Sequence, residues 1–312
     1  MKPKLAFYWC ASCGGCEEAV VDLDEALLDV ANAVDIVFWP VALDFKVKDV
    51  EAMADGSLLA SFINGAVRNS DQLAMARLLR AKSRVVVAFG VCAQLGGIPG
   101  LANLTDARSI LEEVYRDGAT PQTHWGDNGH TLTLPELFDS VSRLDDAIDV
   151  DYYVPGCPPT AHIIRDAVRA LLSSELPPKG AVLAPDKALC EQCPRRETRP
   201  EKLLLAEFKR VHRVIAASDT CLLAQGLVCL GPATRAGCEA MCIRGNMPCT
   251  GCFGPTSRVR DFGAKALSAT ASVIDLKDTG AVAEGMNGVP DPVGTFYRYS
   301  LPSCLMGRHS TE

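Results

Sequence analysis

The sequence predicts an α/β protein in which a doubly wound parallel sheet is followed by a smaller, irregular, cysteine-rich domain. Three observations support this fold class. Short β-branched or aromatic runs alternate with stretches of helical periodicity in the first half of the 312 residues. Eight of the fourteen cysteines lie between residues 190 and 252. Between the two patterns, residues 175–185 combine proline and glycine, which places a domain boundary near residue 180.

Residues 1–180 contain the signals of parallel strands joined by helices. The expected strands cover residues 4–9, 35–40, 59–64, 84–90 and 151–154. The expected helices cover residues 17–33, 70–81 and 161–173, where apolar residues recur at i, i+3 and i+4. Because parallel strands need crossover connections, which are usually helices, this alternation predicts a flavodoxin-like sheet with helices on both faces.

Residues 181–312 have weaker signals of regular structure. We expect two helices, over residues 202–216 and 257–274. Between them, residues 221–254 have the glycine, proline and cysteine spacing typical of loops around a metal. The last thirty residues, which include 285–294, have little capacity for regular structure. We expect them to form an extended tail that lies on a partner.

The composition argues against nucleic acid and membrane partners. The net charge is -7 without a long run of Lys or Arg, so the chain has no electrostatic footprint for nucleic acid. The N-terminal residues contain no twin arginine and no apolar leader, and the apolar runs are too short to span a bilayer. We therefore expect a cytoplasmic protein without a membrane span. In such a chain, fourteen cysteines favour metal binding over disulfides.

Four cysteines of the first domain follow the ends of predicted strands. They are Cys13, Cys16, Cys92 and Cys157. Because ligands collect outside the carboxyl ends of strands in doubly wound sheets, these thiols are expected to converge on one edge. Gly14 and Gly15 allow close approach of the backbone to sulfur, and the next helix offers its positive end to thiolates.

Two other interpretations of this edge are weaker. Cys92 and Cys157 could be small buried apolar side chains, as free cysteines often are, but both stand beside glycines at strand ends. A flavodoxin-like sheet could also bind a nucleotide there, but neither G-x-G-x-x-G nor G-x-x-x-x-G-K-S/T occurs in the chain. A metal centre is therefore the predicted occupant.

The eight cysteines of the second domain divide in chain order into two complete sets of four. One set is Cys190, Cys193, Cys221 and Cys229. The other is Cys238, Cys242, Cys249 and Cys252. Four thiolates hold a [4Fe-4S] cluster, but they also hold structural zinc. The spacing alone leaves both choices open.

Six motifs spread over the chain together resemble one protein family. They are Tyr8-Trp-Cys-Ala-Ser-Cys-Gly-Gly-Cys-Glu-Glu18, Phe38-Trp-Pro-Val41, Phe62-Ile-Asn-Gly-Ala-Val-Arg68, Gly90-Val-Cys-Ala-Gln-Leu-Gly-Gly-Ile-Pro-Gly-Leu-Ala-Asn103, Val154-Pro-Gly-Cys-Pro-Pro159 and Cys249-Thr-Gly-Cys-Phe-Gly-Pro255. With them, nearly the whole chain resembles the small subunit of cytoplasmic [NiFe] hydrogenases. The most similar type is the methyl-viologen-reducing, deazaflavin-non-reducing one associated with heterodisulfide reductase.

The resemblance implies three [4Fe-4S] clusters that relay electrons. The proximal cluster would be held by Cys13, Cys16, Cys92 and Cys157. The medial one would be held by Cys238, Cys242, Cys249 and Cys252, and the distal one by Cys190, Cys193, Cys221 and Cys229. In the periplasmic branch of the family, a histidine opens the distal set and the medial set has three cysteines. Cys190 and Cys242 supply those ligands here, which favours three all-cysteine clusters and a cytoplasmic role.

The resemblance also implies partner subunits. The nickel-iron centre would lie on a hydrogenase large subunit only, because the R-x-C-G-x-C and D-P-C-x-x-C-x-x-H motifs of that subunit are absent here. Electrons would then pass to an acceptor subunit, for which a [2Fe-2S] cluster is one expectation, and to heterodisulfide reductase. Two alternatives remain, namely the iron-sulfur subunit of a quinone-reductase-like respiratory complex and a zinc-stapled scaffold.

Other residues have simpler expected roles. Acids in a first helical turn complement the helix dipole, which accounts for Glu17 and Glu18. Cys10 and Cys304 are expected not to be ligands. Three further groups are expected to lie in an exposed loop: His124, Asp127 and His130. A charged turn is expected for Arg195, Arg196 and Arg199, where docking of the acceptor subunit is the alternative.

Overall fold

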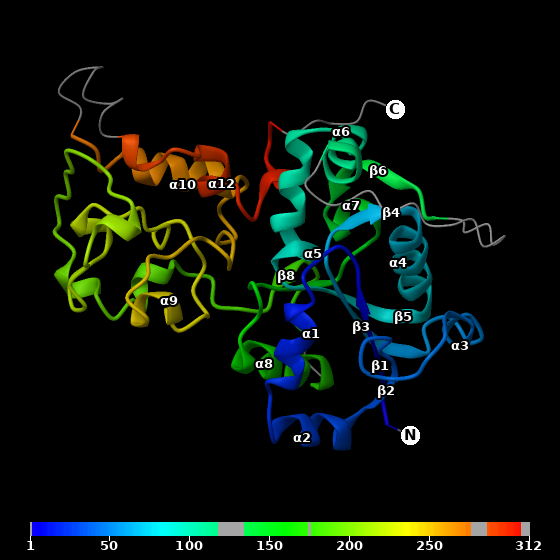
Figure 1. The fold of residues 1–312 in the computed structure, drawn as a ribbon. Helices are drawn as coiled ribbons and strands as arrows, with labels where there is room; N and C mark the ends of the chain where they lie inside the picture. The colour runs from blue at the N-terminus through cyan, green and yellow to red at the C-terminus, as the bar shows by residue number, and fades with distance from the viewer. Residues whose placement is uncertain (1, 118–133, 174–175, 276–285, 307–312) are drawn as a thin grey trace.

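The first lobe of the protein is built on a parallel sheet. The computed structural model describes residues 2–117, 134–173, 176–275 and 286–306 (Figure 1). Six strands pair in the order β2-β1-β3-β5-β7-β8, and every pair is parallel. Their bounds are β1 Lys4–Trp9, β2 Asp35–Phe38, β3 Leu58–Asn64, β5 Ser83–Phe89, β7 Tyr152–Val154 and β8 Ala181–Val182. The predicted fold class is confirmed, and β8 extends the sheet just beyond residue 180.

Helices cover both faces of this sheet. On one face lie α1 (Gly15–Val21), α2 (Ala26–Ala33) and α8 (Ala161–Leu172); on the other lie α3 (Val47–Glu51), α4 (Ser70–Lys82) and α7 (Leu144–Ala147). Alternate strand residues point to opposite faces. Accordingly, Leu5 and Phe7 pack with α1 and α8, whereas Ala6 between them packs with α4.

The predicted helix over residues 17–33 is divided in two. α1 ends at Val21, and Asp24 adopts a left-handed conformation with φ 51° before α2 begins. A continuous helix cannot pass through such a residue, because its backbone dihedrals are right-handed throughout. The chain therefore turns at this point.

Several short elements of the first lobe were not predicted. They are β4 Val67–Asn69, which pairs antiparallel with β6 Leu137–Ser142, the helices α5 Val91–Leu95 and α6 Ala107–Glu112, the 3₁₀ segment η1 Ile98–Leu104 and the π-helical turn η2 Glu113–Asp117. Most are too short to show a period in the sequence.

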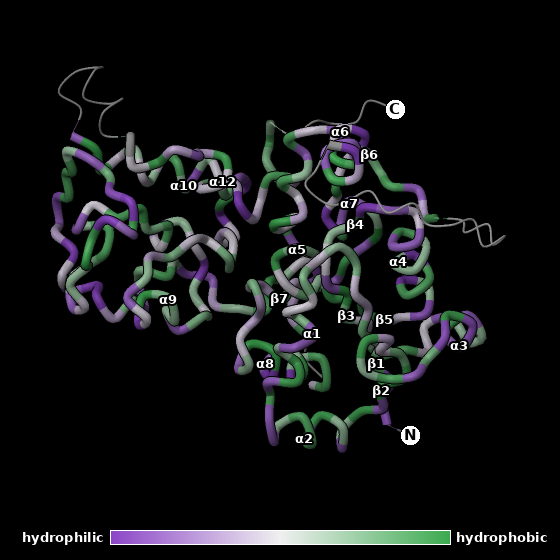
Figure 2. The backbone as a smooth tube through the Cα atoms, in the orientation of Figure 1, coloured by the Kyte–Doolittle hydropathy of each residue, from purple (hydrophilic) through white to green (hydrophobic). Residues whose placement is uncertain are grey.

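The second lobe has its own buried core and little regular structure. Its elements are the 3₁₀ turns η3 Leu189–Glu191, η4 Arg196–Thr198, η5 Val211–Arg213, η6 Leu223–Gln225 and η7 Met286–Gly288, and the helices α9 Met241–Arg244, α10 Phe262–Ala271 and α12 Pro292–Phe296. The 3₁₀ turn η8 Leu301–Ser303 packs against η1 and α5 of the first lobe. Both hydrophobic and hydrophilic residues occur along helices of both lobes, such as α8 and α10 (Figure 2). Among the described residues, no helix is long and apolar enough to cross a membrane.

Three predictions for this lobe need correction. The expected helix over residues 202–216 is wrong, because Leu205 and Lys209 instead form β-bridges to Ile274 and Leu227, so tertiary pairing outweighs helix propensity. The helix expected over 257–274 is shorter. It begins at Phe262, where the Asp261 side chain accepts a hydrogen bond from the backbone N–H of Ala264.

The expected extended C-terminal tail is also wrong for the described residues. Residues 286–306 fold back onto the chain, and Phe296 and Tyr299 are buried. Asp291 caps α12 by accepting a hydrogen bond from the Gly294 N–H, and Pro292 occupies the first helical position, where its missing N–H costs nothing. Val289, Phe296 and Tyr299 therefore pack against this chain, whereas Leu305 and Met306 at the end of the segment are exposed.

A buried carboxylate holds β5, β7 and α4 together. Asp151 is 4% exposed and accepts hydrogen bonds from Arg80 and from the Val86 N–H, and it pairs with Lys179 at 2.7 Å. Burial acts to raise the pKa of Asp151, but these partners outweigh it and hold the pKa below its ordinary value.

Replacing this carboxylate with an amide is expected to lower the free energy of unfolding. Because the folded-state pKa is depressed, the contribution is complete above the unfolded-state value of about 3.9 and is lost as the pH falls through the folded-state value. Asp151→Asn should cost about 1–3 kcal/mol at pH 7. Urea unfolding from pH 7 to pH 3 should show the difference from wild type shrinking. Asp55→Asn, at an exposed ion pair with Lys82, should change little; equal effects of the two variants would contradict the prediction.

Candidate metal centres

The first cysteine set lies at the carboxyl edge of the sheet, as predicted. Cys13 and Cys16 follow β1, Cys92 lies in α5 after β5, and Cys157 follows β7. The pKa of the Cys16 thiol is raised by burial and then by the nearby Cys92, Cys157 and Cys13. Burial raises the pKa of Cys92 to about 12, with a further contribution from Cys157. The four sulfur atoms thus interact with one another across strands distant in sequence.

Two glycines leave the space that these sulfur atoms occupy. Gly90 has φ +84°, and a Cβ at that position would lie 2.3 Å from the Sγ of Cys16. Gly97 has φ +59°, and its Cβ would lie 2.3 Å from the Sγ of Cys92. Both positions require a left-handed backbone and closer approach to sulfur than any side chain permits. The backbone is therefore shaped around the thiols, which fits a bulky sulfur-ligated group.

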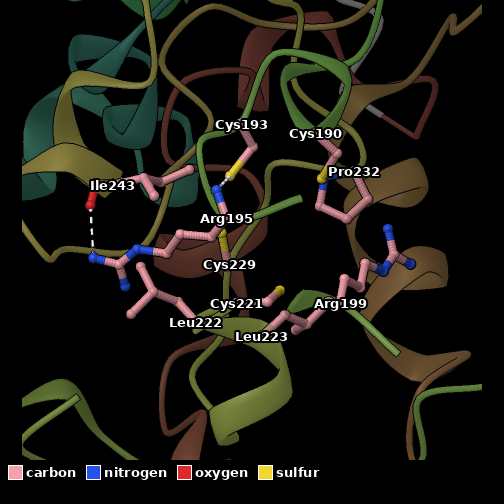
Figure 3. Close-up of a pocket in the computed structure, with 10 residues that line it drawn as sticks. All are labelled: Cys190, Cys193, Arg195, Arg199, Cys221, Leu222, Leu223, Cys229, Pro232 and Ile243. Atoms are coloured by element: carbon pink, nitrogen blue, oxygen red, sulfur yellow. Dashed lines mark hydrogen bonds between the residues drawn. The ribbon is translucent and has the colours of Figure 1, made fainter. Parts of the chain in front are cut away.

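The second cysteine set lines one pocket of the second lobe (Figure 3). Its four members, Cys190, Cys193, Cys221 and Cys229, share the pocket with Arg195, Arg199, Leu222, Leu223, Pro232 and Ile243. Burial raises the pKa of Cys190 to about 12, and Cys229, Cys193 and Cys221 add to this effect. Gly231 again leaves room, because a Cβ there would lie 3.3 Å from the Sγ of Cys190.

Backbone amides point at sulfur in this pocket. The N–H of Arg195 donates to the Sγ of Cys193 at 3.4 Å, and the N–H of Cys249 donates to the Sγ of Cys229 at 3.4 Å. Such hydrogen bonds stabilise thiolates and tune an iron-sulfur cluster. The donor set, the glycine and the amides fit a [4Fe-4S] group.

The third cysteine set comprises Cys238, Cys242, Cys249 and Cys252, and Cys242 lies in α9. Burial raises the pKa of Cys252 to about 12, with further contributions from Cys238, Cys157 and Cys242. Burial also raises the pKa of Cys249 well above its ordinary value, and its neighbours Cys229 and Cys252 contribute. Each sulfur of this set therefore interacts with another of the same set.

The third set lies between the other two in space, although it comes last in the chain. Cys252 interacts with Cys157 of the first set, and both pack against the small apolar cluster around Tyr299. Cys249, three residues earlier, contacts Cys229 of the second set through its backbone N–H. The C-x-x-C segment 249–252 thus connects the two outer sets.

All fourteen cysteines are free thiols in the structure. Within the described ranges, no three His, Cys, Asp or Glu side chains are grouped closely enough to hold a single metal ion. Cys13 and Cys242 are exposed and the other members of the three sets are buried or half-buried. Cys10 packs in the core on the α4 face, away from Cys16, and Cys304 interacts with Asp261. That neither is a ligand remains a prediction.

Two charged residues differ from the sequence-based interpretation. Glu17 is 3% exposed and accepts hydrogen bonds from the side chains of Trp39 and Asn64, and burial raises the pKa of its carboxyl. Complementing the helix dipole explains exposed Glu18 but not Glu17. Trp39 and Asn64 stand in two of the motifs quoted above, but nothing in the sequence near Glu17 indicates that they contact it. Arg195 is buried, whereas Arg196 and Arg199 are exposed. The predicted loop of His124, Asp127 and His130 lies outside the described residues.

Comparison with known proteins gives consistent matches. Residues 13–171 match the family described as NADH ubiquinone oxidoreductase, 20 kDa subunit. The F420-non-reducing hydrogenase iron-sulfur subunit of Archaeoglobus profundus is 40% identical, over 99% of both chains. An F420-non-reducing hydrogenase subunit of Methanothermobacter thermautotrophicus is 38% identical, over 98% of this chain and 96% of its own. In fold, a [NiFeSe]-hydrogenase chain of Desulfomicrobium baculatum is similar, with TM-score 0.55, 17% identity and coverage of 82% and 95%.

Proposed function

Because the chain belongs to the family of the 20 kDa subunit of NADH ubiquinone oxidoreductase and, along its whole length, to that of these F420-non-reducing hydrogenase subunits, we propose that it relays electrons from H2 oxidation through three [4Fe-4S] clusters. It is an oxidoreductase subunit, the electron-transfer small subunit of a hydrogenase. Hydrogen oxidation itself belongs to a large subunit with a nickel-iron centre.

The observation that carries this proposal is the spatial order of the cysteine sets. The set of Cys13 would hold the proximal cluster, the set of Cys238 the medial one and the set of Cys190 the distal one. Electron transfer through a chain of clusters requires successive clusters to lie close together. The contacts of Cys252 with Cys157 and of Cys249 with Cys229 support the order proximal, medial, distal. When bound, each cluster would accept and release one electron.

The proposal includes partners at both ends of the relay. Exposed Cys13 and half-exposed Trp9 lie at the carboxyl edge of the sheet, which suits cover by the large subunit. Around the distal set, residues 195–213 hold seven Lys and Arg against three Glu, a net charge of +4 in a chain of net charge -7. Such a segment favours an acidic acceptor surface. We propose an acceptor subunit linked to heterodisulfide reductase, in the cytoplasm.

The division into residues 1–180 and 181–312 also belongs to this proposal. Separate buried clusters on the sheet and around Leu230 support it. Its limits are blurred by Phe253, which packs in the core of the first lobe. The second domain would then hold the medial and distal clusters against the first.

The family match keeps a second candidate open, the iron-sulfur subunit of a quinone-reductase-like complex. That match ends at residue 171, whereas nine cysteines lie beyond it, eight of them in the second and third sets. A chain with only the proximal cluster would fit this candidate, and a zinc-stapled scaffold would contain no cluster.

Metal content separates the three candidates. The chain should be purified anaerobically with its co-purifying partners, and iron, zinc and acid-labile sulfide should be determined. About twelve irons per chain beyond those of the partners are expected, with interacting electron paramagnetic resonance signals after reduction by dithionite. About four irons would favour the quinone-reductase-like candidate. Zinc with little sulfide would contradict electron transfer.

A further inference from the structure

A buried arginine lines the pocket of the second cysteine set, with its guanidinium turned toward Ile243 (Figure 3). Arg195 follows Cys193 by two positions, is 4% exposed and lines the pocket formed by the four cysteines of that set (Figure 3). Arg196, the next residue, is exposed. Burial of one of two adjacent arginines is unusual, because removing a charge from water costs free energy and arginine side chains are almost never fully buried without a partner.

All the hydrogen-bond acceptors that the structure gives this guanidinium are neutral. They are the carbonyl oxygens of Ala217, Thr220 and Ile243 and the side-chain oxygen of Asn246. Among the described residues, no Asp or Glu forms an ion pair with Arg195. The guanidinium therefore has hydrogen-bond acceptors, but within the described part of the chain no negatively charged side chain forms an ion pair with it.

A buried positive charge needs a counter-charge. Arginine cannot release its proton in a protein, so it cannot escape this cost by becoming neutral. An unpaired buried ion would cost several kcal/mol. The group in the same pocket that can supply negative charge is the set of four cysteines, which becomes anionic when its thiolates hold a cluster.

We propose that Arg195 sets the reduction potential of the distal cluster as its buried counter-charge, an inference that rests on the proposed function. Reduction adds one electron to the cluster, and a fixed positive charge in the same pocket stabilises that electron. Arg195 therefore raises the potential and favours transfer of electrons toward the distal end. The guanidinium acts on the cluster electrostatically and is not a ligand. The backbone N–H of Arg195, by contrast, donates a hydrogen bond directly to the Sγ of Cys193.

The distinguishing variant is Arg195→Gln, which keeps hydrogen-bond donors, removes the charge and leaves the backbone N–H in place. It should be compared with wild type in the intact complex by potentiometric titration followed by electron paramagnetic resonance. One of the three one-electron steps should move. At a fixed potential, the ratio of reduced to oxidised distal cluster should fall roughly tenfold, which is a shift of about 59 mV to more negative potential.

Arg196→Gln is the matched control, because it removes the same charge from an exposed neighbour. Water and salt screen that charge, so the ratio should change less than about twofold. Arg195→Lys retains the charge on a different head group and should stay within about threefold of wild type. If the Arg195→Gln protein does not bind its clusters, Arg195→Lys is the variant that tests the inference. A tenfold fall in the ratio of reduced to oxidised distal cluster in Arg195→Lys, with full iron content, would overturn the inference, because that variant keeps the positive charge.

Failure of the inference can be told from failure of the proposed function. If wild type lacks about twelve irons per chain, the proposed function fails and no distal cluster exists to be tuned. If iron content is complete in every variant but Arg195→Gln and Arg196→Gln move the potential equally, or neither moves it, Arg195 is only a structural residue. A selective shift with Arg195→Gln supports the role of its charge.

Discussion

Replacing Cys16 with serine is expected to remove the proximal cluster and to disconnect the relay from its source of electrons. Cys16 is buried, and its sulfur interacts with those of Cys92, Cys157 and Cys13. The backbone of Gly90 passes so close to this sulfur that a Cβ at position 90 would lie 2.3 Å from it. A serine oxygen is a poorer ligand for iron than a thiolate. Iron content should fall from about twelve to about eight per chain. Hydrogen-dependent reduction of an acceptor dye at the distal end should fall further than the roughly 10–100-fold typical of outer-shell changes.

Cys10→Ser is the matched control, since it makes the same chemical change three residues from Cys13. Cys10 is buried in the apolar core on the opposite face of the sheet, so its substitution should cost some stability. The iron content and dye reduction of the folded complex should stay at wild-type levels. Loss of four irons from Cys10→Ser, with retention in Cys16→Ser, would show that the first set has been chosen wrongly.

Truncating Arg235 is expected to loosen the junction between the two lobes. Arg235 is 1% exposed and is the largest fully buried side chain of the described chain. It pairs with Asp186 at 3.0 Å and donates to the Ser257 hydroxyl. It also donates to three carbonyl oxygens, those of Ala184, Pro185 and Pro255. The segment after β8 and the loop after the C-x-x-C segment 249–252 are therefore joined through one guanidinium.

Arg235→Ala leaves a cavity and removes all of these donors at once. The expected cost is about 2–4 kcal/mol, most of it from lost packing and unpaired carbonyls, because Asp186 is half exposed and can be hydrated. The apparent Tm in anaerobic calorimetry should fall by at least about 5 °C. Arg258→Ala, at an exposed position nearby, should change the Tm by less than about 2 °C. Similar Tm values for the two alanine variants would mean that the buried contacts of Arg235 contribute little.

Local patterns in the sequence were sufficient for the fold class. The expected strand over residues 4–9 coincides with β1, and the helices expected over 70–81 and 161–173 differ from α4 and α8 by one residue at an end. These signals depend on neighbours a few positions apart, because side chains alternate along a strand and recur every three or four residues along a helix. The rule that ligands collect at the carboxyl ends of parallel strands then predicted the place of Cys13, Cys92 and Cys157.

The sequence-based predictions failed where contacts between residues distant in the chain decide the structure. The segment 202–216 has helical spacing, but Leu205 and Lys209 form bridges to Ile274 and Leu227 that exclude a continuous helix. Glu17 and Arg195 looked like surface charges, because nothing near them in the chain reports that Trp39, Asn64 or Ile243 closes over them. Burial of a charge is decided by residues distant in sequence, and no local pattern records it.

The α/β class and the cysteine-rich second half follow from local periodicity and composition, so they could be predicted without a structure. The division of twelve cysteines into three sets of four remains a prediction. The contacts of the last set with both of the others arise only in the tertiary structure, and they agree with the medial position that the resemblance implied. Cys252 meets Cys157 and Cys249 meets Cys229 because the second lobe folds back on the edge of the sheet. Order along the chain is a one-dimensional property, whereas the neighbours of a sulfur atom are set by how distant segments pack.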